Sequence, residues 1–215
     1  MRIAILGAGA VGSYYGALLA RAGHEVELLA RGDNRKAIAT EGLQVRTPEE
    51  EFRVRPAVTG DPEGLQPADL AIVAVKSYSL PEIAKAARRV AAAGADLLPL
   101  LNGVDAAGEL VRCGVPPERV LGGITAISVS RPAPGCVLRH SPFQTVIVGE
   151  LQGGLSLRAE RAAGAFAGAG VDAWASPDVR LDLWRKFIFL STLSAACGLA
   201  RGAAVGDPRQ GGKEC

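Results

Sequence analysis

The stretch RIAILGAGAVGSYYGALLARAGHEVELLA, residues 2–30, decides how the chain begins to fold. Residues 2–6 form an apolar run typical of a buried strand, residues 11–22 have the length and pattern of a helix, and residues 25–30 indicate a second strand. Gly23 and His24 lie between the helix and the second strand, where glycine stops a helix and allows a tight return. The stretch therefore predicts a strand, a helix and a second strand packed together.

The turn between the first strand and the helix has the spacing G-x-G-x-x-G. It consists of Gly7, Ala8, Gly9, Ala10, Val11 and Gly12. In this spacing the first glycine permits the tight turn, the second lets the backbone approach a pyrophosphate, and the third lets the helix pack closely on the strand. The helix N-terminus offers unpaired N–H groups to the phosphates. Because it follows a strand and opens a helix, the turn predicts a dinucleotide site; the alternative is a glycine-rich helix entry without a ligand.

The end of the second strand indicates which dinucleotide binds. Folds that bind NAD usually place Asp or Glu there, where the carboxylate accepts hydrogen bonds from the ribose. This chain has Arg31 at that position, and a guanidinium suits a 2′-phosphate. We therefore expect NADP(H) as the cofactor. Asp33 keeps an NAD site open as an alternative, and Arg31 could also be an ordinary solvated loop side chain.

Strand-like and helix-like segments continue to alternate after the first 30 residues. Strands are expected at residues 70–75 and 96–101, and helices at 80–93 and 104–112. This alternation predicts an α/β fold with a Rossmann-type, doubly wound parallel sheet. Further on, strands are expected at 120–128, 137–139, 145–149 and 172–175, a helix at 158–169, and a turn-rich break at 131–135.

The last part of the sequence predicts a change of domain. Ser176-Pro177-Asp178 offers a break and an N-cap for a long helix at residues 179–199. We expect residues 1–176 to form the NADP-binding domain and residues 177–201 to hold the first helix of an all-α C-terminal domain. Residues 202–215 are rich in glycine and poor in large apolar side chains, which predicts a disordered tail.

The composition gives no sign of a nucleic-acid, membrane or metal partner. The 24 basic and 22 acidic side chains leave a net charge of +2, without a concentrated basic face. The 4 cysteines show no C-x-x-C spacing and there are 2 histidines, so we expect no metal site. The apolar run at 187–200 is shorter than the roughly 20 residues that a membrane span requires. These features favour a cytoplasmic location.

Several segments together resemble the ketopantoate reductase (2-dehydropantoate 2-reductase) family. They are GAGAVGSYYG from Gly7, VAVKSYS around Lys76, LLNGV around Asn102 and LDLWRKF around Lys186. The resemblance extends over residues 1–200 and implies NADPH-dependent reduction of a small 2-oxo acid, 2-dehydropantoate to pantoate, in pantothenate synthesis. It also implies that Lys186 is the general acid. Lys76 and Asn102 would contact the cofactor, and Asn102 and Lys186 would contact the substrate.

The sequence departs from the family pattern at two places. Positions 186, 190 and 194 share one side of the expected helix, and the family carries asparagines at the last two, where this chain has Leu190 and Ser194. We expect Ser194 to contact the substrate, while Leu190 favours a more apolar 2-oxo acid. The family's helical domain also continues for about a hundred further residues, of ordinary domain size. We therefore expect a C-terminal truncation or a frameshift.

Alternatives to this assignment remain open. Lys76 could be a solvated lysine at a strand end, Asn102 a turn former, and Lys186 an interfacial cation with a buried stem. The chain could also be a catalytically incomplete fragment that binds dinucleotide, or a related hydroxyacid dehydrogenase that prefers NADH. The apolar helix at 179–199 would leave an exposed face, which predicts self-association as a homodimer.

Overall fold

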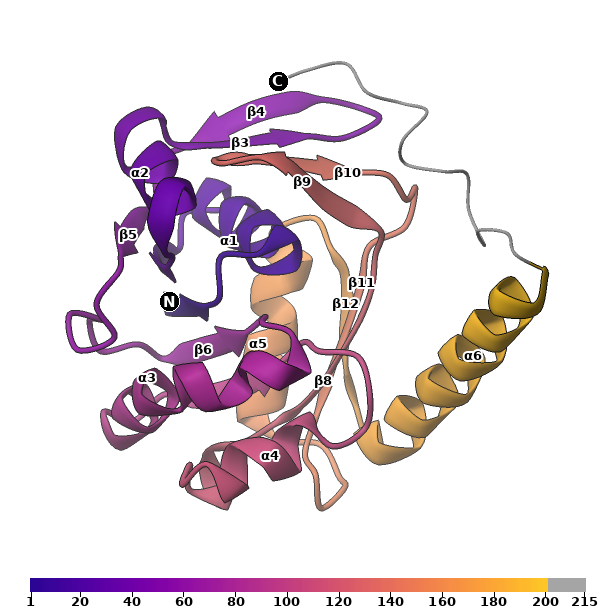
Figure 1. Ribbon diagram of the computed structural model, residues 1–215. Helices are drawn as coiled ribbons and strands as arrows, with labels where there is room; N and C mark the ends of the chain where they lie inside the picture. The colour runs from indigo at the N-terminus through magenta and orange to yellow at the C-terminus, as the bar shows by residue number, and fades with distance from the viewer. Residues whose placement is uncertain (201–215) are drawn as a thin grey trace.

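The structure is a computed structural model that describes residues 1–200, and its elements are labelled in Figure 1. A parallel sheet has the strand order β5-β2-β1-β6-β7. Its strands are β1 (Arg2–Leu6), β2 (Glu25–Leu29), β5 (Ala57–Thr59), β6 (Leu70–Val73) and β7 (Asp96–Pro99). The chain leaves β1 toward β2 on one side and returns to β6 on the other, so the strand order reverses beside β1. Ligands of open α/β sheets bind at such a switch point.

Helices cover both faces of this sheet. They are α1 (Ala10–Arg21), α2 (Gly32–Glu41), α3 (Leu80–Ala92) and α4 (Ala106–Arg112), with the short 3-10 helices η1 (Ser77–Ser79) and η2 (Pro117–Arg119) between elements. Alternate residues of β1 enter two different cores: Ile3 and Ile5 pack with α1, whereas Ala4 and Leu6 pack with α3. All of β6 is buried, as expected for a strand covered on both faces. The predicted doubly wound, Rossmann-type sheet is confirmed.

A second sheet lies beyond α1, and it was not anticipated from the sequence. Its order is β4-β3-β10-β9, with β3 (Leu43–Arg46), β4 (Glu51–Val54), β9 (Val129–Ala133) and β10 (Cys136–Arg139). The turn-rich break predicted at residues 131–135 is wrong for its first part, because β9 extends through Pro132 to Ala133. Pro132 is tolerated there because β9 is an edge strand, where one side of the backbone needs no partner.

A third sheet is built entirely from the second half of the described chain. Its order is β12-β11-β8, with β8 (Gly122–Ala126), β11 (Thr145–Gly149) and β12 (Asp172–Ser176), and α5 (Leu157–Gly168) packs against it. The ring of Phe166 on α5 meets the ring of Tyr15 on α1 edge-on, with centroids 5.4 Å apart. Both side chains are fully buried, so α5 and α1 share one core.

The long helix α6 (Val179–Ala200) extends away from the rest of the molecule (Figure 1). The predicted boundary after Ser176 falls at the junction between β12 and this helix. Only Val179 of the helix is buried. Its large exposed apolar side chains are Leu181, Trp184, Phe187, Ile188, Phe189 and Leu199. The predicted disordered tail, residues 202–215, lies outside the described residues, and no helix within residues 1–200 is long and apolar enough to cross a membrane.

Candidate active site

The glycine turn connects β1 to α1 at the switch point of the parallel sheet. Gly7 has a φ of +111°, a backbone conformation that other residues rarely adopt, and an added Cβ there would lie 2.5 Å from Val75 Cγ1. Gly9 is the N-cap of α1 and supplies no side-chain cap. The N–H groups in the first turn of α1 are therefore left for another acceptor, and a phosphate group suits them.

The other two glycines of the turn meet very different surroundings. A Cβ added at Gly12 would overlap the carbonyl oxygen of Gly7 and lie 2.9 Å from Ile5 Cγ2. A Cβ added at Gly9 would meet only Ala74 O, at an ordinary contact distance of 3.7 Å. Gly12 thus permits the close packing of α1 on β1, whereas Gly9 keeps open the space in front of the helix N-terminus. These contacts match the separate uses of the glycines in dinucleotide-binding turns.

A cavity of about 590 Å³ begins at this turn and follows the carboxyl ends of the parallel strands. Its walls include the turn from Gly7 to Val11, and also Arg31, Lys76, Asn102, Thr125 and Arg131. The structure therefore brings most of the residues predicted to bind cofactor to one cavity. Gly12 is buried behind the turn, where it contributes packing. A dinucleotide fits this arrangement because the turn leaves room for phosphates and cations line the far walls.

Arg31 lies at the wall of the cavity, at the N-cap of α2. Its Nη1 is 2.9 Å from Oε2 of Glu82, which lies in the first turn of α3 and lines the same cavity. Both side chains are exposed, so solvent screens the pair and its contribution to stability is small. The positive charge of Arg31 is thus available to a ligand, with an acidic side chain directly beside it.

Lys186 and Asn102 meet at another part of the site. Asn102 follows β7 and lines the cavity, and its Oδ1 accepts a hydrogen bond of 3.0 Å from Lys186 Nζ on α6. Burial lowers the pKa of the Lys186 ammonium below the ordinary value of lysine. Lys76, which follows β6, is an exposed residue of the cavity wall. A hydrogen-bond donor, an amide and a second cation are therefore gathered near the carboxyl ends of β6 and β7.

Ser194 is placed differently from the other predicted site residues. It is exposed on α6, about 12 Å farther along the helix axis than Lys186 at 1.5 Å per residue. In the described part of the chain, no residue of α6 belongs to the cavity wall, and Lys186 is connected to it through the hydrogen bond to Asn102. The structure does not bring Ser194 together with Asn102, so a contact between Ser194 and substrate stays a prediction.

Two polar residues that the sequence did not indicate hold the glycine turn in place. Asn34 is buried; its Nδ2 donates to Ala8 O at 2.9 Å, and its Oδ1 accepts from the backbone N–H of Gly135 at 2.9 Å. Arg131 of β9 also donates to Ala8 O, at 3.2 Å, and lines the cavity. The turn is thereby tied to the β9–β10 hairpin, which adds a third cation to the cavity wall, after Arg31 and Lys76. No local pattern marks either residue, because the partners are far apart in sequence.

Thr125 adds a buried hydroxyl to the cavity wall. Its Oγ1 lies 2.5 Å from the hydroxyl of Tyr15, and both side chains are buried. Burial raises the pKa of the Tyr15 phenol, so it keeps its proton. Either hydroxyl can be the donor in this contact. When Tyr15 donates, the proton of Thr125 is free to point toward an acceptor in the cavity.

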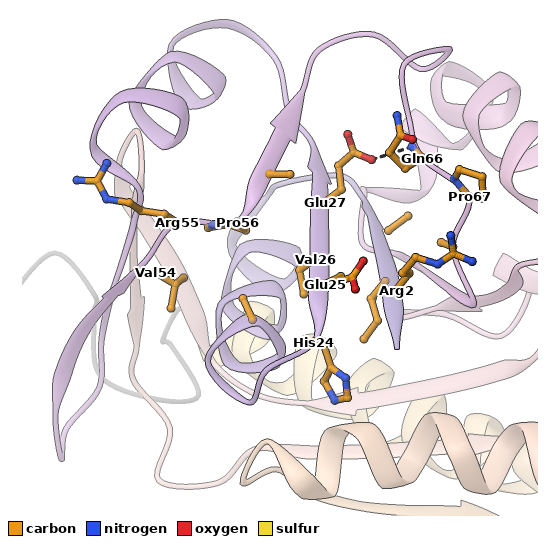
Figure 2. A pocket seen from close by; sticks show the side chains of 15 residues that line it. Arg2, His24, Glu25, Val26, Glu27, Val54, Arg55, Pro56, Gln66 and Pro67 are labelled. Atoms are coloured by element: carbon orange, nitrogen blue, oxygen red, sulfur yellow. Dashed lines mark hydrogen bonds between the residues drawn. The ribbon is translucent and has the colours of Figure 1, made fainter.

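A second cavity, of about 540 Å³, lies at the opposite, amino ends of β1 and β2 (Figure 2). Arg2 and Arg55 line it together with Glu25 and Glu27, so its charges are of both signs. The Glu27 carboxylate already accepts a hydrogen bond of 2.8 Å from the backbone N–H of Gln66. Because ligands of open α/β sheets bind at the carboxyl ends of the strands, the cavity at the glycine turn is the candidate active site.

Known proteins share this architecture. Residues 3–153 match the model of the family described as "Ketopantoate reductase PanE/ApbA". The 2-dehydropantoate 2-reductase of Halobacterium salinarum is 33% identical over 213 residues, which are 97% of this chain and 69% of that protein. The structure of 2-dehydropantoate 2-reductase from Geobacter metallireducens has a TM-score of 0.85 and 33% identity, covering 94% of this chain and 66% of that chain. D-mandelate dehydrogenase with NADH and anilino(oxo)acetate has a TM-score of 0.82 and 26% identity, covering 92% and 63%.

The parallel sheet and its glycine turn define an α/β protein with a Rossmann-type domain. The chain belongs to the ketopantoate reductase family, a family of oxidoreductases, and the resemblance drawn from the sequence motifs is confirmed. It spans 63% to 69% of the length of the three proteins compared above.

Proposed function

We propose that this protein binds NADP(H) in the cavity at the glycine turn and reduces a 2-oxo acid, with Lys186 as the general acid. The observation that carries this proposal is the hydrogen bond of 3.0 Å between Lys186 Nζ and Asn102 Oδ1. It joins the predicted proton donor to a residue of the cavity wall, although the two lie 84 positions apart in the sequence. Family membership supports the same activity.

The cavity offers a suitable place for each part of the cofactor. The first turn of α1 and the open space at Gly9 suit the pyrophosphate, and Arg31 suits a 2′-phosphate. Lys76 and Asn102 lie at the ends of β6 and β7, where we assign them contacts with the nicotinamide half and the substrate. The D-mandelate dehydrogenase complex contains NADH, which supports a nicotinamide dinucleotide as the cofactor here.

When bound, the reduced nicotinamide would supply the hydride for the ketone carbon. Negative charge then develops on the ketone oxygen, where an ammonium group stabilises it and can donate the proton. Lys186 can do both because its pKa is lowered by burial toward the range in which proton donation is effective. Asn102 orients the ammonium by accepting one of its hydrogen bonds.

We propose 2-dehydropantoate as the substrate, in pantothenate synthesis and in the cytoplasm. Leu190, in place of an asparagine, supports a second candidate, a related hydroxyacid dehydrogenase for a more apolar 2-oxo acid. The D-mandelate dehydrogenase structure, of similar architecture, holds anilino(oxo)acetate, an aromatic analogue of a 2-oxo acid. Dinucleotide binding without catalysis is the third candidate.

The test is the rate of NADPH oxidation with 2-dehydropantoate and with an aromatic 2-oxo acid. Lys186→Ala should abolish the rate, while Arg185→Ala should retain it, because Arg185 is solvent-exposed and, within residues 1–200, pairs only with Asp182 of its own helix. A rate that survives in Lys186→Ala would refute the role of the lysine. Dinucleotide binding without any turnover would favour the third candidate, and a preference for the aromatic acid would favour the related dehydrogenase.

We also propose that α6 associates with a second copy of the chain. Apolar side chains lie on all sides of this helix, a pattern typical of helices that are buried. Trp184 and Ile188 are 52% and 61% exposed, so they have little cover within residues 1–200. Sedimentation over a range of concentrations should show a dimer, and Ile188→Glu should shift it to monomer; a wild-type monomer at all concentrations would exclude the association.

A further inference from the structure

Glu82 forms an ion pair with the arginine to which we assign the 2′-phosphate. The pair places opposite charges at one point of the cavity wall, with Arg31 Nη1 and Glu82 Oε2 2.9 Å apart. The side chains are 60% and 56% exposed, so packing locks neither of them. An incoming ribose could therefore meet either charge.

The two charges suit two different ribose substituents. NAD-binding folds use a carboxylate at the end of the second strand to accept a hydrogen bond from the ribose 2′-hydroxyl. In this chain that position is Arg31, while a carboxylate reaches the same place from the first turn of α3. The arginine suits a 2′-phosphate through its fork of donors, and the carboxylate of Glu82 suits a 2′-hydroxyl.

We propose that Glu82 determines the cofactor preference together with Arg31, and that the site accepts both NADPH and NADH. This inference rests on the dinucleotide binding proposed above. A 2′-phosphate is attracted by Arg31 and repelled by Glu82, whereas a 2′-hydroxyl can donate to Glu82. The carboxylate thus reduces the advantage that the arginine gives to NADPH.

The size of the effect follows from the exposure of the pair. Interactions between exposed charges are weak and are screened by salt, so removing the charge of Glu82 changes affinity only moderately. We expect Glu82→Gln to tighten NADPH binding by roughly twofold to fivefold and to weaken NADH binding by about twofold. Arg31→Gln should have the opposite effect on the ratio of the two dissociation constants.

The experiment is a fluorescence titration of the full chain with NADPH and with NADH, at low and at high salt. The matched control is Glu63→Gln, because Glu63 also forms an exposed ion pair, 2.5 Å from Lys85, but is outside the cavity wall. The control should leave both dissociation constants unchanged. The gain of Glu82→Gln for NADPH should decrease as salt is added, and thermal melting verifies that each variant is folded.

The outcomes separate this inference from the proposed function. A wild type that binds neither dinucleotide refutes the proposed function. The wild type could bind NADPH, with Arg31→Gln weakening NADPH binding as expected. If Glu82→Gln then leaves the ratio of the two dissociation constants unchanged, or weakens NADPH binding, only the role of Glu82 is refuted. A wild type that binds NADPH but shows no binding of NADH would also overturn the dual acceptance.

Discussion

The glycine turn allows stability and cofactor binding to be separated by two similar substitutions, Gly12→Ala and Gly9→Ala. Each adds one methyl group to the same turn, but the surroundings differ. At Gly12 the methyl group would overlap Gly7 O and lie 2.9 Å from Ile5 Cγ2, and neither neighbour can turn away, since one is backbone and the other is fully buried. At Gly9 the nearest atom, Ala74 O, would be 3.7 Å away.

The magnitudes follow from these contacts. Overpacking of this kind costs about 1–3 kcal/mol, and the better helix propensity of alanine offsets up to about 1 kcal/mol, so Gly12→Ala should lose about 1–2 kcal/mol. For a protein of this size, that loss lowers Tm by about 2–8 °C. Gly9→Ala should change stability by less than about 0.5 kcal/mol, because its φ of −74° suits alanine. Its methyl group would instead occupy the space in front of α1 and weaken dinucleotide binding at least about tenfold, as a lost or displaced phosphate contact would.

The assay combines thermal melting with dinucleotide titration for both variants. Gly164→Ala is the control: Gly164 lies on the exposed side of α5 with nothing within 4 Å of an added Cβ, so alanine should stabilise the helix by about 0.5–1 kcal/mol. The reasoning is refuted if Gly9→Ala melts as early as Gly12→Ala. It is refuted equally if Gly9→Ala, fully folded, binds dinucleotide as tightly as the wild type.

Three further predictions concern buried polar groups. Burial lowers the pKa of Lys186, so between that lowered pKa and the ordinary pKa of lysine the unfolded chain binds more protons than the folded chain. The free energy of unfolding should therefore rise with pH across this window. In denaturant titrations at several pH values, Lys186→Met should flatten this rise. Arg158 forms a two-point ion pair with Glu150, at 2.6 and 2.5 Å, and lowers the pKa of that carboxyl. The pair therefore stabilises the fold at pH values above the ordinary pKa of glutamate, and this stabilisation is lost as pH falls through the lowered pKa of Glu150. Arg158→Ala should cost about 1–3 kcal/mol of stability at neutral pH. It should also remove this acid dependence from a pH series of melting curves. Tyr15→Phe should lose about 0.5–1.5 kcal/mol in chemical denaturation, because Thr125 loses its buried partner.

The first half of the fold was accessible from the sequence because its signals are local. The helix predicted at 11–22 is found at Ala10–Arg21, and the strand predicted at 70–75 is found at Leu70–Val73. Strands that are buried on both faces leave uninterrupted apolar runs, which are easy to recognise. A glycine turn between such a strand and a helix requires specific residues at fixed positions, and so the dinucleotide-binding turn was identified together with the fold.

The second sheet was missed because its strands carry weak signals. Successive residues of β4 (Glu51–Val54) alternate between exposed and half-buried, and the strand contains as many charged as apolar residues. β9 contains a proline, which usually argues against a strand and is acceptable here only because β9 lies at a sheet edge. Whether a strand is at an edge depends on the pairing of distant segments, such as β10 with β3, and such pairing has no local signature.

The chemistry of the site was only partly visible for a related reason. Asn34, Glu82 and Arg131 become site residues through contacts that span 26, 51 and 123 positions in the sequence. Each would pass for an ordinary polar surface residue when read with its neighbours alone. Asn102 and Lys186 were singled out through the family resemblance, because a turn asparagine and a helix lysine carry no distinctive pattern of their own.

The position of Lys186 depends on the first turns of α6 rather than on its exposed remainder. Val179 is fully buried, and Cβ atoms added at Gly122 and Gly149 would lie 2.5 and 2.7 Å from its side chain, so two glycines make room for it. Asp182 then accepts a hydrogen bond of 2.6 Å from Ser176 Oγ, which fixes the rotation of the helix. Lys186 follows Val179 by about two turns, close enough for this anchor to direct its ammonium to the cavity. A partner that covers the later turns would stabilise the helix without having to place the Lys186 ammonium.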